Sequence, residues 1–267
     1  MKPHTGFRAA NESGMVKMIS VGLGKEKGCT TMHQNGLAET IPAAAKVALK
    51  VAPIIGGLGI VENSKEQTAN IRAALPEKLM QVDSELLLEA KSMLPQIPFD
   101  EFDVLIVDEM GKNISGTGMD VNVIGRMYKL GELEPERPRI NRIAVLDLTE
   151  ASHGNALGMG LADITTERFH SKIDFAATYA NVIAAGVMER GRTPVSVKND
   201  QEAIRIALAS IPGLAPEKAR LIRIKNTLEL EEFLISETLL SEAASNPDLE
   251  IKEPSVELKF DQEGNLL

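Results

Sequence analysis

The sequence is poor in cysteine and in aromatic residues. It contains one cysteine, Cys29, no tryptophan and two tyrosines among 267 residues. A single cysteine excludes a disulfide within the chain, which fits a reducing compartment, and we expect a cytoplasmic location. The few aromatic rings offer little surface on which nucleobases could stack. These absences argue against a disulfide-stabilised secreted domain and against a protein that binds single-stranded nucleic acid.

Basic clusters and long apolar runs are absent from the sequence as well. The formal net charge is −9 and the lysines and arginines are dispersed, which argues against a surface for nucleic acid. No run approaches the roughly eighteen apolar residues that cross a bilayer, and the polar start does not resemble a signal peptide. We therefore expect neither nucleic acid nor a membrane as a partner.

The common motifs of nucleotide-binding and hydrolytic enzymes are missing too. The sequence has no GxxxxGK[ST] phosphate loop, no HExxH, no CxxC and no GxSxG. The stretch GLGKEKG at 22–28 comes near the dinucleotide fingerprint GxGxxG, but Lys27 stands where the third glycine belongs. A helix is predicted before it, whereas the fingerprint requires a strand. We therefore reject a Rossmann dinucleotide site.

The order of apolar segments predicts an α/β protein, because short apolar strands alternate with amphipathic helices. We predict two α/β domains with mostly parallel sheets and a cleft between them, and Pro95 and Pro98 place the boundary between residues 1–100 and 101–267. Helices are predicted at 13–24, 29–35, 41–51, 64–75, 84–94, 173–185 and 200–211. Strands are predicted at 53–61 (buried), 102–107, 142–148, 220–224 and 231–236, with a final strand and turn at 254–267.

Two of the predicted strands end in glycine-rich loops. FDVLIV at 102–107 is followed by DEMGKNISGTG, and RIAVLDL at 142–148 is followed by TEASHGNALGMG. Near-continuous apolar runs are typical of buried parallel strands, and ligands of open α/β sheets bind at the carboxyl ends of such strands. We therefore expect either a ligand cleft at these loops or, in the plainer interpretation, only tight turns.

Reactive side chains are concentrated near the start of the chain. Two of the four histidines, His4 and His33, flank Lys17. The predicted helix at 13–24 has one apolar stripe at spacings of three and four, and an opposite face of small and polar residues with Lys17 in its middle. Small neighbours let a ligand approach a helix closely, so Lys17 could hold one. Alternatively, Lys17 is a solvated lysine and the two histidines are ordinary surface residues.

This segment resembles the core of the nickel-dependent lactate racemase family. The family shows a Pro-His pair, a Gly/Ser-rich turn that ends in lysine, and a histidine one helix further on. Here these correspond to Pro3–His4, to residues 12–17 (ESGMVK) and to His33, and the lysine-to-histidine step (33 − 17 = 16 residues) matches the family spacing. The stretches at 102–122 and 142–166 resemble a divergent branch of the same family, so the resemblance covers essentially the whole chain.

The resemblance implies a cofactor and a role for each residue. Family members bind a nickel-pincer nucleotide, nickel pyridinium-3,5-bisthiocarboxylic acid mononucleotide. Lys17 would carry it through a thioamide, with Ser13 and Gly14 beside it in the turn. His33 would give nickel its fourth ligand, a role that suits imidazole. His4 would be one of two acid–base histidines at the α-carbon of a 2-hydroxy acid, which loses its hydroxyl proton while its hydride moves to the cofactor.

The second domain carries a further, weaker match to the family. Residues 120–122 (DVN) resemble an Asp-x-Asn step, after which the family has a glutamine and a lysine that contact substrate or cofactor. These two positions fall on Gly125 and Tyr128 here. Arg126 or Lys129 could supply the cation that a substrate carboxylate needs, and the mismatch suggests a substrate other than lactate. The alternative is that both are surface cations on a helix.

The chain also departs from the family pattern. The second acid–base histidine and the loop that holds the cofactor phosphate belong to the family's amino-terminal part, for which we find no counterpart. His153 and His170 match no family histidine, and the step from His4 to Lys17 (17 − 4 = 13 residues) is a few residues longer than in characterised racemases. We therefore expect an incomplete site, explained by a misplaced gene start, a shortened chain or a separate chain with the missing half. A homo-oligomer is the other expected partner.

Three functions remain open at this point. The first is a racemase or epimerase of a 2-hydroxy acid, incomplete without an amino-terminal half. The second is a non-catalytic binding or assembly subunit with the same fold. The third is an oxidoreductase with a different bound nucleotide, in which Lys17 only contacts a phosphate. Nickel and a covalent adduct on Lys17 are expected for the first function alone.

Overall fold

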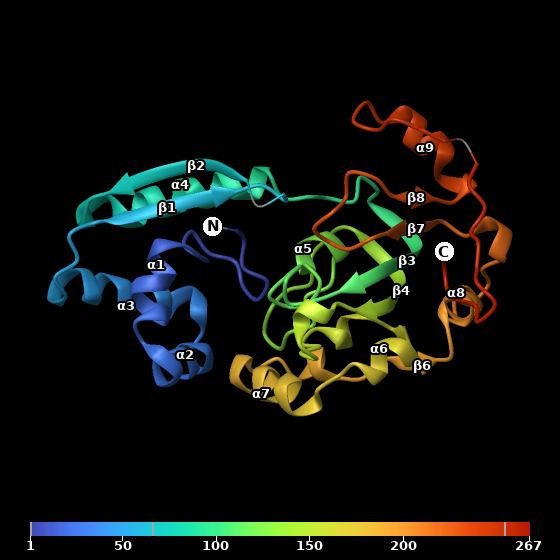
Figure 1. Cartoon of the computed structure of the whole chain (residues 1–267). Helices are drawn as coiled ribbons and strands as arrows, with labels where there is room; N and C mark the ends of the chain where they lie inside the picture. Colours follow the sequence, from blue (N-terminus) through green and yellow to red (C-terminus); the bar gives the residue numbers. More distant parts are fainter. Residues whose placement is uncertain (1, 66, 254) are drawn as a thin grey trace. The chain divides into compact units, whose positions relative to one another are not determined.

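The chain divides into two compact units, Met1–Pro95 with Ile183–Gly186, and Gln96–Val182 with Val187–Leu267. The computed structural model describes residues 2–65, 67–253 and 255–267. Each unit combines helices and strands (Figure 1), which confirms the predicted α/β class. Residue 66, inside the helix predicted at 64–75, and residue 254, at the start of the predicted tail strand, lie outside the described residues.

The first unit is built from helices and a β-hairpin. Its elements are α1 (Met15–Lys17) with a π-helix (Met18–Gly22) directly after it, α2 (Lys25–Gln34), α3 (Leu37–Val51), β1 (Gly57–Glu62), β2 (Thr68–Ala74) and α4 (Leu79–Ser92). The helix predicted at 13–24 is present as α1 and the π-helix, and those predicted near 29–35 and 41–51 are α2 and α3. The core contains Phe7, Val16, Ile41, Leu79 and Leu86.

The hairpin corrects the prediction of a helix at 64–75, because Thr68–Ala74 form strand β2. β2 pairs with β1 in antiparallel order, with Ile60 opposite Ile71, and packs on α4. The alanine-rich sequence of β2 favours a helix locally, but pairing and packing override that preference. The sheet of the first unit is therefore antiparallel, whereas parallel sheets were predicted in both domains.

β1 is half-buried and differs from the fully buried strand predicted at 53–61. Leu58 and Ile60 are 60% and 39% exposed, while Gly59 and Val61 are buried. A Cβ atom on Gly59 would lie 2.4 Å from a methyl carbon of Leu86, so a glycine is needed where α4 approaches the strand. One face of the hairpin is therefore packed, and the other exposes apolar side chains.

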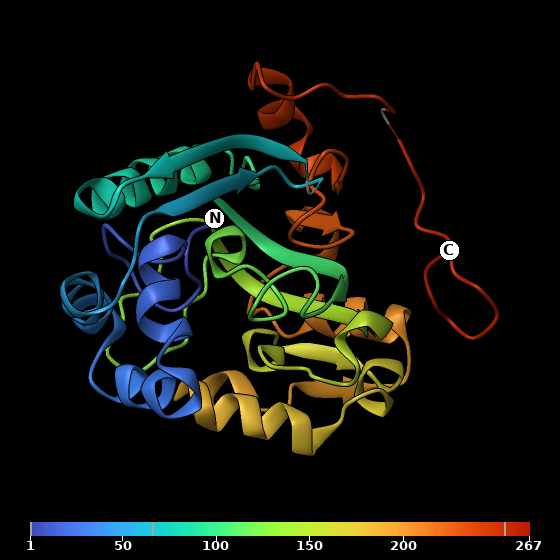
Figure 2. The ribbon, with the colours of Figure 1, turned by 60° about the vertical axis from the view of Figure 1, so that its left-hand side comes forward.

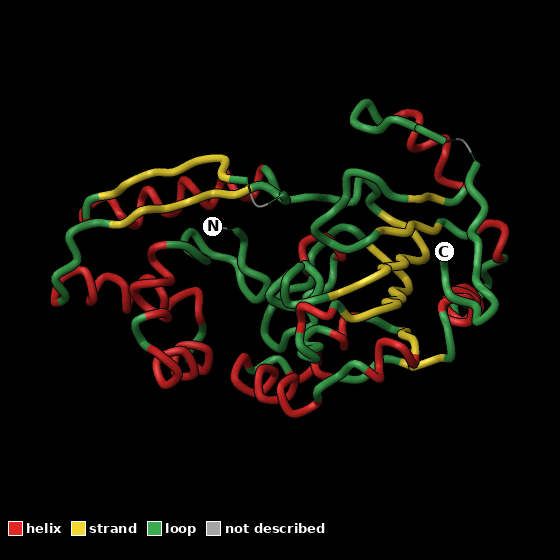
Figure 3. The backbone as a smooth tube through the Cα atoms, in the orientation of Figure 1, coloured by secondary structure: helices red, strands yellow, loops and turns green. Residues whose placement is uncertain are grey.

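The second unit contains a six-stranded sheet in the order β6-β5-β4-β3-β7-β8, in which every pair is parallel except β7 with β8. Its strands are β3 (Glu101–Met110), β4 (Arg139–Leu148), β5 (Ile164–Thr166), β6 (Val195–Val197), β7 (Leu221–Ile224) and β8 (Leu234–Ile235). Its helices are α5 (Val121–Ile124), α6 (Glu167–Ser171), α7 (Phe175–Ala185, up to Val182 in this unit), α8 (Asp200–Ala209) and α9 (Leu240–Ser245). Figures 2 and 3 show β3 and β4 side by side in this sheet. The predicted strands at 102–107 and 142–148 are confirmed.

The sheet separates two apolar layers. Val107 and Val145 belong to one core, and their neighbours Ile106 and Ala144 belong to the core on the opposite face, because successive strand residues alternate in direction. Helix α8 covers the second face through alanines such as Ala203. Near-continuous apolar strands are required because both faces of the sheet are covered.

The end of the chain forms a turn against this unit. In place of the predicted final strand, the structure has a single bridge between Phe260 and Leu266. The Leu266 N–H donates to Oδ2 of Asp200 (2.9 Å), and Arg168 Nη1 donates to Oδ1 of Asn265 (3.0 Å). These bonds hold the turn beside the start of α8.

Substitution of Gly125 tests the backbone conformation of the loop that follows α5. Its φ is +62°, and a Cβ atom there would lie 1.9 Å from the carbonyl oxygen of Pro138. We expect Gly125→Ala to lower the free energy of unfolding by about 2–3 kcal/mol, since both the left-handed backbone and the close approach oppose a side chain. Urea unfolding measures this. Gly116→Ala, where nothing lies within 4 Å, is the control, and equal destabilisation by the two variants would contradict the structure.

Candidate functional site

The site in the first unit is built on a loop that wraps around Glu12. This side chain is fully buried. Its Oε2 accepts the N–H of His4 (3.0 Å), and its Oε1 accepts the N–H of Ala9 (3.0 Å) and a proton from Nζ of Lys91 on α4 (2.8 Å). One carboxylate therefore fixes the backbone of the 3–12 segment to the second half of the unit.

A second buried carboxylate, Asp83 on α4, fixes the start of α1. Its Oδ2 accepts from Nδ2 of Asn11 (3.1 Å), and its Oδ1 accepts the N–H of Val16 (3.3 Å) in the first turn of α1. The N–H groups of a first turn have no partner inside the helix, so Asp83 replaces a cap. Burial raises the pKa of Asp83, and the bonds from Asn11 and Val16 partly offset this.

His4 is held by both its backbone and its ring. Its Nδ1 lies 2.9 Å from the N–H of Gly6, and its ring centroid lies 4.5 Å from that of Phe7. A ring nitrogen that accepts an N–H carries no proton itself, so the neutral imidazole has its proton on Nε2. In this arrangement His4 presents a proton donor at Nε2.

Lys17 is the last residue of α1 and stands directly before the π-helix. The π-helix is closed by the bond from Leu23 N–H to Met18 O (3.0 Å), and the Ser20 hydroxyl donates to Val16 O (2.7 Å). Single π-turns inside helices occur frequently at functional sites, where they change the direction of the neighbouring side chains. The local backbone thus sets Lys17 apart from an ordinary helical lysine.

The turn before α1 contains Ser13 and Gly14, as the resemblance requires. Gly14 has a φ of +87°, a conformation that favours glycine. The hydroxyl of Ser13 donates to the carbonyl of Lys2 (2.5 Å). Both residues therefore shape the turn through the backbone, and their contact with a cofactor stays a prediction.

Burial lowers the pKa of the Lys17 amine, and the nearby Cys29 side chain offsets this in part. Cys29 lies on α2, so α1 and α2 bring the amine and the thiol into one neighbourhood. At a given pH, a lysine with a lowered pKa is neutral more often than an ordinary lysine, and the neutral amine is the form that reacts as a nucleophile. Lys17 is half-buried, and its role as the attachment point of a cofactor stays a prediction.

His33 lies one turn after Cys29 on α2. Its Nδ1 is 2.8 Å from the carbonyl oxygen of Cys29 and 3.5 Å from Sγ of the same residue. A carbonyl oxygen can only accept, so Nδ1 carries the proton and Nε2 keeps its lone pair. Metal-binding histidines usually donate their second N–H in this way, which fixes the ring and the tautomer. The Nε2 lone pair of His33 is thus free of the ring proton, and its role as a metal ligand stays a prediction.

The lowered pKa of Lys17 has two measurable consequences. We expect the midpoint of its reaction with acetic anhydride, followed by mass spectrometry against pH, to lie below the ordinary lysine value of 10.5. The unfolded chain then binds the Lys17 proton more tightly than the folded chain, so stability should rise with pH between the lowered pKa and 10.5. Lys17→Met should remove this rise. A labelling midpoint at or above 10.5 would contradict the burial of the amine.

Arg126 corrects a prediction, because its guanidinium is bound within the protein. It is 7% exposed. Nη1 donates to the carbonyl of Leu161 (2.9 Å), and Nη2 donates to the carbonyl of Ile140 (3.1 Å) and pairs with Asp163 (2.8 Å). These partners lie at the amino ends of β4 and β5, whereas ligands of such sheets bind at the carboxyl ends. Arg126 therefore has a structural role and is left out of the site.

Lys129 lies in a loop, whereas the alternative interpretation of the sequence placed it on a helix. α5 ends at Ile124, Gly125 is left-handed, and Tyr128 has a φ of +41°. Nζ of Lys129 is 3.5 Å from Oε1 of Glu132, and its side chain is 18% exposed. Its role as a partner of a substrate carboxylate stays a prediction.

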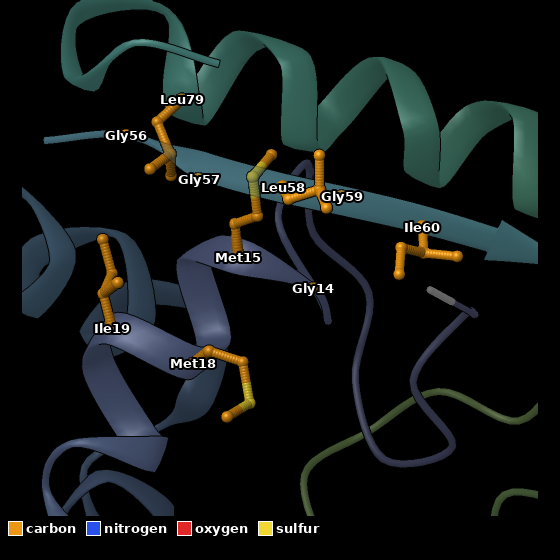
Figure 4. A pocket seen from close by; sticks show the side chains of 10 residues that line it. All are labelled: Gly14, Met15, Met18, Ile19, Gly56, Gly57, Leu58, Gly59, Ile60 and Leu79. Carbon is orange, nitrogen blue, oxygen red and sulfur yellow. The ribbon is translucent and has the colours of Figure 1, made fainter. Parts of the chain in front are cut away.

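The first unit also has an apolar pocket of about 350 Å³ beside α1. Figure 4 shows Met15 and Met18 on one wall and the glycine-rich strand β1 on the other. A Cβ atom on Gly57 would lie 2.6 Å from Sδ of Met15, so this glycine makes room for the methionine. Lys17 does not line the pocket, which is therefore distinct from the amine's neighbourhood.

The comparisons with known proteins identify no relative. No family model, no curated protein and no solved structure matches the chain. Within the described residues there is no group of three or more His, Cys, Asp or Glu side chains that could hold a metal by themselves. No helix in the described parts of the chain has the length and apolar character needed to cross a membrane.

Proposed function

We propose that the chain is a divergent member of the nickel-dependent lactate racemase family that racemises or epimerises a small 2-hydroxy acid. The observation that supports this most strongly is the neighbourhood of Lys17, Cys29 and His33. It combines a half-buried amine of lowered pKa with an imidazole whose Nε2 keeps its lone pair. A covalently attached cofactor needs such an amine, and its metal needs such an imidazole.

The residues fit the nickel-pincer nucleotide. Lys17 would carry it, because a neutral amine is the form that can be acylated or thioacylated. His33 would bind the nickel through Nε2, held in place by its bond to the Cys29 carbonyl. When bound, the group supplies a hydride acceptor. The protein supplies position, charge and proton transfer.

His4 would move the proton of the substrate hydroxyl. With its Nδ1 accepting from Gly6, the neutral ring carries its proton on Nε2, so His4 can take the hydroxyl proton only after this bond is released and the ring proton moves to Nδ1. The imidazolium formed in that way would return the proton to the substrate oxygen. Inversion of a centre requires an acid–base group on each face. We propose that a partner polypeptide, either a complementary amino-terminal half or a second copy, supplies the other group.

The proposal is tested by producing the chain together with the enzymes that make the cofactor and supplying single enantiomers of 2-hydroxy acids. Chiral chromatography should show formation of the opposite enantiomer, with or without an added complementary half. Lys17→Arg keeps the positive charge but cannot form the thioamide, so it should be inactive. Protein that carries the cofactor fully, but converts no 2-hydroxy acid in either setting, would contradict the proposed reaction.

A non-catalytic assembly subunit is the second candidate, and the exposed face of the hairpin favours it. Leu58 and Ile71 are 60% and 55% exposed and lie on this face. Exposed apolar patches on soluble proteins often mark interaction sites. Sedimentation velocity of the wild type and of Leu58→Glu distinguishes the cases. Self-association that Leu58→Glu removes supports assembly through this face, and monomers in both samples argue against it for a second copy.

A further inference from the structure

The loop Gly111–Gly118 is a closed structure at the carboxyl end of β3. The N–H of Gly111 donates to the carbonyl of Gly118 (3.0 Å), and the N–H of Ser115 donates to the carbonyl of Gly111 (3.0 Å). The N–H of Thr149 donates to the carbonyl of Met110 (2.9 Å), which joins this loop to the end of β4. The loop therefore lies at the sheet edge where ligands of parallel α/β sheets bind.

A chain of hydroxyl groups fixes the side chain of Asn113. The N–H of Lys112 donates to Oγ of Ser152 (2.8 Å), which lies 2.9 Å from Oγ1 of Thr149, and Thr149 donates to Oδ1 of Asn113 (2.6 Å). Because Oδ1 of Asn113 accepts, its Nδ2 group is turned away with two N–H donors, on an exposed side chain. A Cβ atom on Gly111 would lie 2.0 Å from Oγ1 of Thr149, so a glycine is required under this chain.

Lys112 is a half-buried cation of the second unit whose hydrogen-bond partners are neutral. Its Nζ donates to the carbonyl of Gly116 and to Oδ1 of Asn181 (3.1 Å). By contrast, Lys172 pairs with Asp147 (2.9 Å) and with Glu150 (3.0 Å). An ammonium has three donors, so the third N–H of Lys112 has no partner among the described residues. Burial lowers the pKa of Lys112, as expected for an amine without a carboxylate beside it.

Ser115 adds a further unused group to the loop. It is 1% exposed, and its Oγ has no hydrogen-bond partner within the described residues. Buried hydroxyls without a partner are rare in folded proteins, because each costs free energy. The loop therefore holds several unused donors: the third N–H of Lys112, the amide of Asn113 and the hydroxyl of Ser115.

We infer that the Gly111–Gly118 loop binds a small anion, a carboxylate or phosphate group, with Lys112 as the cation and the Asn113 amide as a second donor. Donors without acceptors call for a ligand that only accepts, and both anions have this chemistry. The neighbouring carboxylates Asp147 and Glu150 are already paired with Lys172. The inference is independent of the nickel chemistry proposed for the first unit.

Titration of the full chain with inorganic phosphate, and separately with acetate, tests the inference. Backbone amide NMR shifts should saturate in the millimolar range or below, with the largest changes in residues 111–118. Lys112→Met should weaken binding by about tenfold or more, because a charge-assisted hydrogen bond is lost. Lys218→Met, at an exposed lysine before the amino end of β7, should leave the affinity unchanged. Saturation by phosphate alone assigns a phosphorylated ligand, and saturation by acetate assigns a carboxylate.

Asn113→Asp is a second variant, which separates a specific loss of anion binding from a loss caused by unfolding. The exposed aspartate can still accept from Thr149, but it places a negative charge where the amide was. We expect the variant to stay folded by circular dichroism and to lose anion binding by about tenfold or more. The inference is wrong if neither anion gives saturable shifts, or if wild type, Lys112→Met and Asn113→Asp bind with the same affinity.

Discussion

Replacement of Glu12 by alanine is expected to destabilise the first unit by about 3 kcal/mol or more, one of the largest effects that a single change should have. The fully buried carboxylate accepts the N–H groups of His4 and Ala9 and pairs with Lys91. Alanine would leave two N–H groups without acceptors, each costing about 1–3 kcal/mol. Lys91 can turn towards solvent, since its side chain is 35% exposed, so the lost ion pair adds little.

The measurement is urea unfolding followed by circular dichroism, with hydrogen exchange of residues 3–17 to show which unit is affected. Glu62→Ala is the control, because Glu62 is exposed at the end of β1, and it should change the stability by less than about 0.5 kcal/mol. We expect the exchange of the 3–17 segment to accelerate only in Glu12→Ala. Equal stability of the two variants would show that Glu12 does not hold the loop.

Replacement of His33 by alanine is expected to remove nickel from protein produced with the cofactor-making enzymes. Its Nδ1 donates to the Cys29 carbonyl, which leaves Nε2 as the ligand. Loss of an outer-shell partner alone costs about 10–100-fold in metal affinity, and loss of a ligand should cost at least as much. Retained nickel, measured by mass spectrometry of the metal, should fall at least about tenfold, while the adduct on Lys17 persists.

His170→Ala is the matched control for His33→Ala. His170 is exposed on α6, where its ring lies 5.6 Å from that of Phe175, and we assign it no role at the metal. It should retain nickel at the wild-type level. Full nickel occupancy in His33→Ala would rule out His33 as the ligand, whatever the activity of the variant.

The second unit was largely predictable from sequence, and its regular strands show why. The apolar runs at 102–107 and 142–148 are long and bounded by polar loops, so their burial in a parallel sheet follows directly. β5 and β6, with three residues each, are too short to show a period and were missed. In the first unit, β2 is a strand because β1 pairs with it, and local sequence gives no sign of this.

The candidate site was predictable as a set of residues but not as an arrangement. His4, Lys17 and His33 could be proposed from their type and spacing, whereas the bond that fixes the His33 tautomer is visible only in the structure. Glu12 and Asp83 were missed as site-forming groups, because Asp83 is 67 residues from its partner Val16 and no local pattern joins them. Arg126 was misassigned because its carbonyl partners at the amino ends of β4 and β5 have no sequence signature.

The most direct test of the central claim is the intact mass of the protein produced with the cofactor-making enzymes, with peptide mapping and nickel analysis on the same sample. We predict a covalent adduct on Lys17 with stoichiometric nickel, no adduct in Lys17→Arg, and an adduct without nickel in His33→Ala. A second sample is produced with a complementary amino-terminal half, because attachment of the cofactor to Lys17 could require such a partner. A bare mass and no nickel in both samples, from folded protein, would contradict the nickel-dependent racemase assignment.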